Sequence, residues 1–202
     1  MKLYYSPGAC SLSPHIVARE AGIAIELEKV DLGKHKTEKG DDYMTINPKG
    51  YVPALKLDDG SILTEGPAIV QYLADQKPAT KLAPAAGTMD RYRLQEALAF
   101  IGTELHKNFG PLFNPATPDA VKDLAKANIT KRLGNLNDQI GKKQYLLGDT
   151  FTVADAYAFT ILNWANFVRM DLKPFANIGT YMARVGARPK VQEALRAEGL
   201  VK

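Results

Sequence analysis

The sequence predicts a small α/β domain followed by an all-helical domain. Over residues 1–75, short segments with the alternation typical of strands take turns with segments of helical spacing. Residues 77–88 (KPATKLAPAAGT) break this pattern with prolines, a glycine and small residues, and are predicted to be a linker. Beyond this linker the apolar residues recur at helical spacing, without a convincing strand. We therefore expect one domain at 1–80 and a second at 88–202.

Local signals predict the elements of the first domain. Pro14 falls in the first turn of an apolar segment, where a helix tolerates proline. Residues 58–60 (DDG) form a turn between two apolar runs and predict a β-hairpin. In chain order the expected elements are a strand at 1–5, a helix at 11–20, a strand at 24–30, a loop or short helix at 33–45, hairpin strands at 52–57 and 61–63, and a helix at 67–75. The crossovers predict parallel strands, to which the hairpin adds an antiparallel one.

Apolar stripes predict the helices of the second domain. The first stripe comprises Leu94, Leu98, Ile101 and Leu105, and the second comprises Val121, Leu124, Ile129, Leu133, Leu136 and Ile140. A third helix is expected to open at Thr152, with Asp155 completing a capping-box signal. Two short helices follow, the last of them beginning near Arg188.

Composition and charge exclude several functions. The 202 residues include 26 Lys and Arg against 22 Asp and Glu, a formal charge of +4. This mild excess is spread along the chain, so it suits a small anionic ligand better than nucleic acid. The single cysteine, Cys10, excludes an internal disulfide and a Cys-based zinc site, and the three separated histidines give no metal-ligand spacing. No signal peptide or membrane-spanning run is expected, so the predicted location is the cytoplasm.

Cys10 is the first candidate for chemistry. It lies between a predicted strand end and a predicted helix start, where unpaired backbone N–H groups and the helix dipole favour a thiolate. A small buried hydrophobic residue is the equally weighted alternative.

Val52 and Pro53 open the hairpin after a turn. A trans peptide bond at the start of the strand is favoured by base rates. In the alternative, a cis bond turns the Val52 N–H and C=O outward, where another extended chain can pair with them.

Glu65, Gly66 and Pro67 stand where the hairpin meets a helix. The helix start could hold a carboxylate and Glu65 an ammonium, which together describe an α-amino acid. Taken by itself, the motif favours the alternative that Glu65 is a helix-capping acid.

His106 and Lys107 are predicted to close the first helix of the second domain. Ala99, Thr103 and His106 share one helical face, separate from the leucine stripe, and that face could look across at the first domain. The alternative is that the two cations complement the helix dipole.

Trp164 lies in helical register with Tyr157 and Val168. Large aromatic residues at this spacing favour a core position, and the wall of an apolar pocket is the alternative. His15 is expected to be a surface or satisfied histidine.

Five motifs, taken together, resemble the glutathione transferases, specifically the bacterial beta class. They fall in order along the whole chain: residues 5–11 (YSPGACS), 47–55 (NPKGYVPAL), 64–66 (TEG), 104–107 (ELHK) and 152–155 (TVAD). The resemblance implies a thioredoxin-like N-terminal domain, a C-terminal helical bundle and a homodimer. It also makes the motif at Thr152 an element of folding rather than of catalysis.

The resemblance also implies a glutathione site. The segment from Tyr51 to Pro53 would carry a cis-proline and pair with the cysteinyl backbone, and Glu65 and Gly66 would hold the γ-glutamyl end. Further residues are implied to bind glutathione or act on its sulfur: Cys10, Ser11, His35, Ala99, Thr103, His106 and Lys107. Cys10 could form a mixed disulfide with the sulfur. Trp164 would line the pocket of the electrophile, between the domains.

Three residues depart from the family pattern. His35 stands where the family often has a lysine for the glycyl carboxylate, and histidine loses its charge as the pH rises. Ala99 replaces an asparagine that contacts glutathione, often across the dimer, and Pro67 lacks an N–H for the γ-glutamyl carboxylate. Modest affinity for glutathione is therefore expected.

The predicted function is detoxifying transfer of the glutathione thiol, as co-substrate, to small apolar electrophiles. Two alternatives use the same site. In the first, Cys10 is the nucleophile of thiol–disulfide exchange or reductive dehalogenation. In the second, the protein binds ligands without catalysis. Nucleic acid, membranes and metals are not expected partners.

Overall fold

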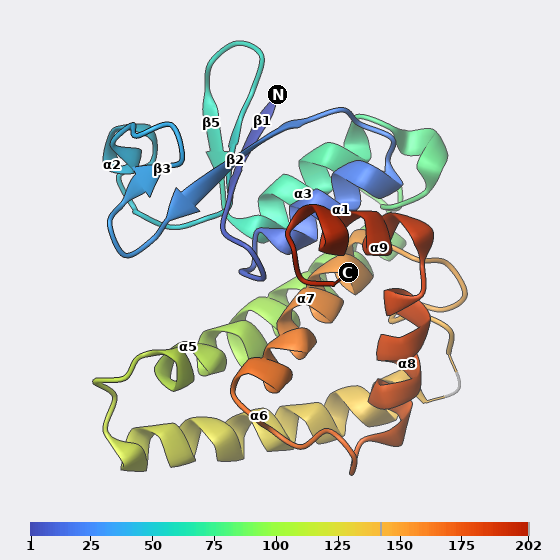
Figure 1. Ribbon diagram of the computed structural model, residues 1–202. Coiled ribbons are helices and arrows are strands. Elements are labelled where there is room, and N and C mark those ends of the chain that lie inside the picture. The colour runs from blue at the N-terminus through green and yellow to red at the C-terminus, as the bar shows by residue number, and fades with distance from the viewer. Residues whose placement is uncertain (142, 202) are drawn as a thin grey trace. The chain divides into compact units, whose positions relative to one another are not determined.

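The computed structural model describes residues 1–141 and 143–201 and divides into two compact units. The first unit comprises Met1–Ala83 together with Arg188–Lys202, and the second comprises Pro84–Ala187 (Figure 1). The division between the units falls between residues 83 and 84, inside the expected linker, and residues 188–202, which were expected in the second domain, group with the first unit. The C-terminal segment belongs to the first unit because its helix packs there, as described below.

A five-stranded sheet forms the centre of the first unit, in the order β3-β2-β1-β4-β5. Its strands are β1 (Lys2–Tyr5), β2 (Glu26–Asp31), β3 (Lys36–Thr37), β4 (Ala54–Lys56) and β5 (Ile62–Thr64). The predicted strands and hairpin are confirmed. The first crossover is parallel, with β1 beside β2, but β4 runs antiparallel to β1. The chain from β2 to β4 does not cross the sheet. It stays at one end, because β4 begins at Ala54, directly opposite Tyr4 near the end of β1.

Helices α1 (Leu12–Glu20), α2 (Tyr43–Ile46), α3 (Gly66–Asp75) and α9 (Pro189–Ala197) complete this unit, with a short 3-10 turn η1 (Pro78–Thr80) after α3. Helix α1 packs against both α3 and α9 (Figure 1). The contact with α9 is polar as well as apolar. Glu198 accepts the Gly8 N–H at 2.9 Å and pairs with Nδ1 of His15 at 2.9 Å. His15 is fully buried and paired, so the expectation of a satisfied histidine is confirmed and a surface position is wrong.

Successive residues of β1 serve the two faces of the sheet, as the pleat of a strand requires. Leu3 is fully buried. Tyr4, on the other face, belongs to a small core with Val30, Tyr43 and Val52. This small core therefore holds the start of the hairpin against the sheet.

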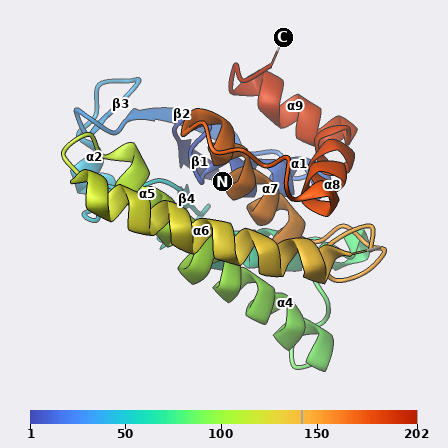
Figure 2. The ribbon, with the colours of Figure 1, turned by 90° about the horizontal axis from the view of Figure 1, so that it is seen from below.

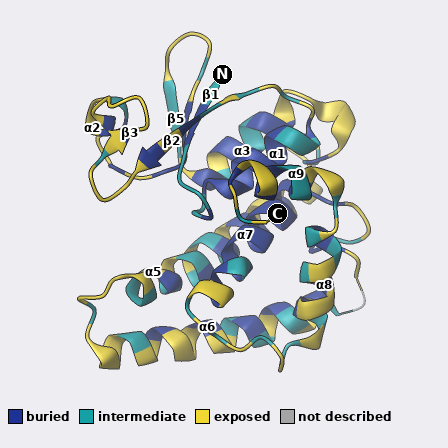
Figure 3. Cartoon of the chain, viewed as in Figure 1, coloured by how far each residue is buried: buried dark blue, intermediate teal, exposed yellow. Residues whose placement is uncertain are grey.

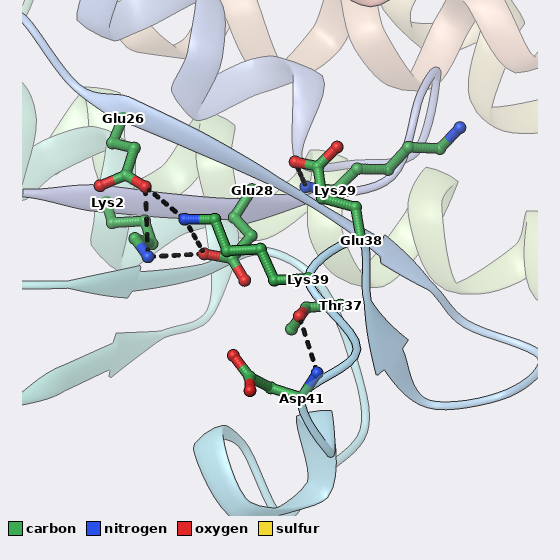
Figure 4. A network of polar contacts seen from close by, with 8 residues as sticks. All are labelled: Lys2, Glu26, Glu28, Lys29, Thr37, Glu38, Lys39 and Asp41. Carbon is green, nitrogen blue, oxygen red and sulfur yellow. Dashed lines mark hydrogen bonds and ion pairs between the residues drawn. The ribbon is translucent and has the colours of Figure 1, made fainter.

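A charged network joins β1 and β2 to the segment after β3 (Figure 4). The ammonium of Lys2 lies 2.5 Å from Oε2 of Glu28, and that of Lys39 lies 3.4 Å from the same oxygen. Both lysines also pair with Glu26. The Glu28 side chain is only 1% exposed. Burial alone would raise the pKa of Glu28, but hydrogen bonding to Lys2 and neighbouring groups outweighs burial and lowers it.

The second unit is helical, and no named strand lies among its described residues. One uninterrupted helical run joins α4 (Met89–Phe100), the π-helical segment η2 (Ile101–His106) and α5 (Lys107–Phe113). The remaining helices are α6 (Asp119–Ile140), α7 (Val153–Phe167) and α8 (Ala176–Gly186). His106 and Lys107 therefore do not close the first helix, and their explanation as cations at a helix end is wrong.

Helix α6 lies along the run from η2 to α5 (Figure 2). The later part of its predicted stripe, from Ile129 to Ile140, is buried. Val121 and Leu124 are 44% and 63% exposed, so the expectation for the first two turns is wrong. Ala125 is the buried residue there, since a helix can turn only one face to its neighbour.

Helix α7 is the most buried helix of this unit (Figure 3). Its predicted capping box is confirmed, because the Asp155 carboxylate accepts the Thr152 N–H at 2.8 Å. Across the described residues, no helix is both long and apolar enough to span a membrane.

Candidate functional site

Cys10 lies in the turn between β1 and α1 and contacts the start of the hairpin. Its thiol donates to the Val52 carbonyl at 3.1 Å. Burial raises the pKa of this thiol to about 12, although the backbone N–H groups of Cys10 and Ser11 act in the opposite direction. The predicted position is correct, but the expected stabilisation of a thiolate does not prevail. Desolvation of the sulfur outweighs the two N–H groups.

Ser11 is the N-cap residue of α1, yet its side chain does not cap the helix. The hydroxyl is buried, accepts the Ser6 N–H at 3.1 Å and lies 3.2 Å from the Ser6 carbonyl. Ser11 therefore fixes the turn that presents Cys10.

The Val52–Pro53 peptide bond is cis, so the trans form favoured by base rates is wrong. Two buried side chains hold the preceding residue. The Asn47 amide and the Tyr43 hydroxyl donate to the Tyr51 carbonyl at 2.7 and 2.8 Å. These bonds set the position of Val52, whereas the Tyr51 side chain is 73% exposed.

Glu65 is the N-cap residue of helix α3, but its carboxylate does not cap the helix. Its side chain makes no capping hydrogen bond and instead accepts the Lys49 ammonium at 2.9 Å. Glu65 has a φ of 70°, a left-handed conformation that few non-glycine residues adopt. Gly66 begins the helix next to Pro53, whose Cγ would lie 3.9 Å from a Cβ at position 66. The structure thus joins the cis-proline turn to the Glu65–Gly66 corner, and the capping interpretation is wrong.

His35 lies beside the same loop. A Cβ on Gly50 would stand 3.0 Å from Cε1 of the His35 ring, so glycine leaves the room that this imidazole needs. Nδ1 of His35 is buried and has no hydrogen-bond partner among the described residues. The ring therefore lies against the loop that leads to Tyr51.

A second cluster lies within the helical unit, around His106. Nδ1 of His106 is 2.6 Å from the Tyr157 hydroxyl, and its ring meets Trp164 edge-on with centroids 4.8 Å apart. Trp164 also meets Phe109 and Phe113 edge-on, at 5.8 and 5.2 Å. Trp164 is buried, as the core interpretation predicts, while Phe113 is 46% exposed. The aromatic cluster therefore extends from the core to the surface of its unit.

Phe109, Phe113 and the role of Tyr157 were not predicted from the sequence. The aromatic residues at 109 and 113 are one helical turn apart, directly after His106, and that spacing was an available signal. No sequence pattern joins Tyr157 to His106, because the two residues come from different helices.

Ala99 and Thr103 remain on one exposed face, where the Thr103 hydroxyl donates to the Ala99 carbonyl at 3.0 Å. His106 is half-buried against α7, and Lys107 is exposed. The three residues of the predicted common face therefore lie in two different environments: Ala99 and Thr103 face solvent, whereas His106 packs against α7.

The fold and these clusters define a class of protein, in which a thioredoxin-like unit with a cis-proline turn accompanies a helical unit. Residues 8–76 match the family model of the glutathione S-transferase N-terminal domain, and residues 100–189 match that of the C-terminal domain.

Individual relatives agree with the family models. A glutathione S-transferase of Escherichia coli O157:H7, GstA, is 50% identical over 200 residues, which are 99% of this chain and 100% of the relative. A beta-class enzyme of Sphingomonas chungbukensis has a TM-score of 0.97 at 50% identity, with both chains fully covered. A sphingomonad glutathione S-transferase solved with glutathione has a TM-score of 0.96 at 49% identity, again with both chains fully covered. The chain belongs to the glutathione S-transferase family, beta class.

Proposed function

We propose that this protein transfers the thiol of glutathione to small apolar electrophiles. The observation that carries the proposal is the cis Val52–Pro53 turn, whose backbone is fixed through the Tyr51 carbonyl and adjoins the Glu65–Gly66 corner. An extended peptide can pair with the backbone of such a turn. A relative of 49% identity was solved with glutathione, which supports this choice of peptide.

Glutathione has groups that suit the residues of the first unit. Its cysteinyl backbone pairs with Val52, and its γ-glutamyl end binds at Glu65 and Gly66. Its glycyl carboxylate binds near His35, and Tyr51 flanks the peptide. This orientation brings the glutathione sulfur to the turn that contains Cys10 and Ser11, whose backbone N–H groups favour a thiolate.

The glutathione sulfur is the nucleophile of the proposed reaction. The Cys10 thiol is protonated at neutral pH in the free protein, because burial raises its pKa to about 12. In the proposed reaction the glutathione thiol loses its proton to solvent and the thiolate forms a C–S bond with the electrophile. An aryl halide then expels halide with the electron pair of the broken C–halogen bond. In an epoxide or an activated alkene the electron pair stays on the oxygen or carbon, which takes up a proton from solvent. His106 and Lys107 contribute positive charge or hydrogen bonds that stabilise the thiolate.

The apolar substrate binds at the aromatic cluster of the helical unit. Trp164, Phe109 and Phe113 offer ring faces and edges, and Phe113 is partly exposed. We assign Ala99 and Thr103 to the rim of the glutathione site, where alanine offers no polar side-chain contact.

The test is a conjugation assay with glutathione and a panel of aryl halides, epoxides and activated alkenes. Saturable conjugation above the uncatalysed rate, weakened at least about tenfold in His106→Ala, is the expected result. Background rates across the whole panel would refute the proposal.

Thiol–disulfide exchange or reductive dehalogenation through Cys10 is a second candidate. The contact between the Cys10 sulfur and the Val52 carbonyl favours it, since bound glutathione would bring its own sulfur to this turn. The Cys10 thiol, which is protonated in the free protein, would first lose its proton to solvent. Its thiolate would then attack oxidised glutathione, form the mixed disulfide and release one glutathione thiolate. Cys10→Ala should abolish this exchange and leave conjugation at least partly intact.

We infer further that the protein is a cytoplasmic homodimer that detoxifies electrophiles without a metal. The family resemblance supports the dimer. Sedimentation at micromolar concentration tests it, and a monomer with full activity would contradict it.

A further inference from the structure

We propose that Lys49 is a specificity residue that recognises the α-amino acid end of glutathione by exchanging its ion-pair partner. In the free protein its ammonium binds Glu65, and in the complex it binds the γ-glutamyl α-carboxylate. This inference rests on the proposed function, because it concerns the same site.

In the free protein, the Lys49 ammonium occupies the carboxylate that is proposed to bind the glutathione ammonium. The Lys49 ammonium lies 2.9 Å from Oε1 of Glu65 and 3.1 Å from Oγ1 of Thr64. Glu65 is the residue proposed to hold the glutathione ammonium. A ligand ammonium must therefore replace Lys49 on this carboxylate or share it.

The backbone of Lys49 is held by a buried residue, whereas its side chain is exposed to solvent. The Lys49 N–H donates to Oδ1 of Asn47 at 3.2 Å, and Asn47 is buried with its amide on the Tyr51 carbonyl. The side chains of Lys49 and Glu65 are 53% and 69% exposed. An ion pair this exposed contributes about 0–1 kcal/mol, so exchange of its partner costs little.

The start of helix α3 offers few donors to a carboxylate. Pro67 has no N–H, and the N–H groups of Ala68 and Ile69 donate to the Glu65 carbonyl at 3.0 Å. The Gly66 N–H is the remaining backbone donor of this first turn. A carboxylate at this corner therefore requires a second hydrogen-bond donor. Lys49 supplies one, because its ammonium is a cation with three N–H donors.

The two charges of the ligand match this arrangement. The α-ammonium and α-carboxylate of a γ-glutamyl group are attached to one carbon, so a ligand ammonium on Glu65 brings the carboxylate beside Lys49. Once Glu65 is taken, the nearest anion for Lys49 is this carboxylate. Glu65 and Lys49 together then recognise a zwitterion and reject peptides that carry only one of its charges.

The test measures binding calorimetrically with two ligands that cannot form a disulfide. One is S-methylglutathione, and the other is its analogue with a 4-aminobutyryl group, which keeps the ammonium and lacks the α-carboxylate. We expect Lys49→Met to raise the Kd of S-methylglutathione by about threefold to tenfold. The same variant should leave the Kd of the analogue unchanged or lower it by up to about threefold, because a competitor for Glu65 has been removed.

Lys56→Met is the matched control, since Lys56 is exposed on β4 and loses the same charge. It should change the Kd values of both ligands slightly and by the same factor. Equal weakening of both ligands by Lys49→Met would overturn the role of Lys49, as would no effect on either. Failure of the wild-type protein to bind S-methylglutathione would instead refute the proposed function itself. Unchanged thermal unfolding of Lys49→Met confirms that the variant is folded.

Discussion

The Tyr157 hydroxyl lies 2.6 Å from Nδ1 of His106, so a residue of α7 fixes a side chain at the end of the π-helical segment η2. The phenol reaches this position beside Gly102, where a Cβ would stand 3.6 Å from the hydroxyl oxygen. Trp164 meets the same imidazole edge-on. A hydrogen bond on Nδ1 sets the tautomer and the orientation of the ring, and thus whether Nε2 can donate or accept a hydrogen bond.

Tyr157→Phe should lower kcat/KM for conjugation by about twofold to tenfold, the equivalent of one net hydrogen bond. The KM for glutathione should change little, because Tyr157 is not among the residues proposed to bind it. Adding Tyr157→Phe to His106→Ala should cause no further loss. Steady-state kinetics of the two single variants and the double variant checks all three expectations.

Tyr181→Phe is a matched control for this prediction. Tyr181 is also buried in the helical unit and donates to Asp155 at 3.0 Å, away from His106. We expect this control to lower the melting temperature and leave kcat/KM per folded molecule unchanged. Equal catalytic losses in both tyrosine variants would show that the effect of Tyr157 is only structural.

Cys10 should be nearly inert towards alkylation in the free protein. With its pKa raised to about 12, its thiolate fraction at pH 8 lies far below that of an ordinary cysteine. Iodoacetamide should therefore react with the native protein more than about a hundredfold slower than with the urea-unfolded chain. Intact-mass spectrometry follows this reaction simply, because Cys10 is the single cysteine. Native and unfolded rates within tenfold of each other would contradict the buried, protonated thiol.

Glu198→Ala should destabilise the protein by about 3 kcal/mol or more. The substitution leaves the Gly8 N–H and the fully buried His15 without this carboxylate, and it weakens the contact between α9 and α1. Urea unfolding monitored by circular dichroism measures the change. Glu193→Ala, a more exposed glutamate of α9, is the control and should cost less than about 1 kcal/mol. Similar losses in both variants would refute a special role for Glu198.

Glu28 should make the fold sensitive to acid. Its pKa is lowered in the folded protein, where Lys2 donates to it at 2.5 Å against the opposing effect of burial. A lowered folded pKa stabilises the fold above the unfolded pKa of about 4.3, and this stabilisation is lost as the pH falls through the folded value. Glu28→Gln should therefore flatten the dependence of the melting temperature on pH below about pH 5.

Lys2→Met complements this experiment at neutral pH. It leaves a buried carboxylate with Lys39 as its more distant cation, at 3.4 Å (Figure 4). We expect a loss of about 1–3 kcal/mol at pH 7 that shrinks as Glu28 is protonated. An unchanged acid transition in both variants would exclude Glu28 as its source.

Patterns local to the sequence predicted much of this fold. The hairpin around residues 58–60 and the capping box at Thr152 were predicted correctly, because each depends on neighbouring residues. The helical period likewise found every long helix. It failed at Val121 and Leu124, which the neighbouring helix does not cover, and at His106, where the helix continues beyond the predicted end.

The family motifs identified the candidate residues, and the sequence by itself determined the class of protein. Three features depended on contacts between distant segments, and only the tertiary structure decided them. Burial against Val52 holds Cys10 as a thiol, α9 belongs to the first unit through Glu198, and Lys49 rather than a helix end is the partner of Glu65. Desolvation and long-range pairing depend on which atoms meet in space, and neither composition nor periodicity encodes that directly.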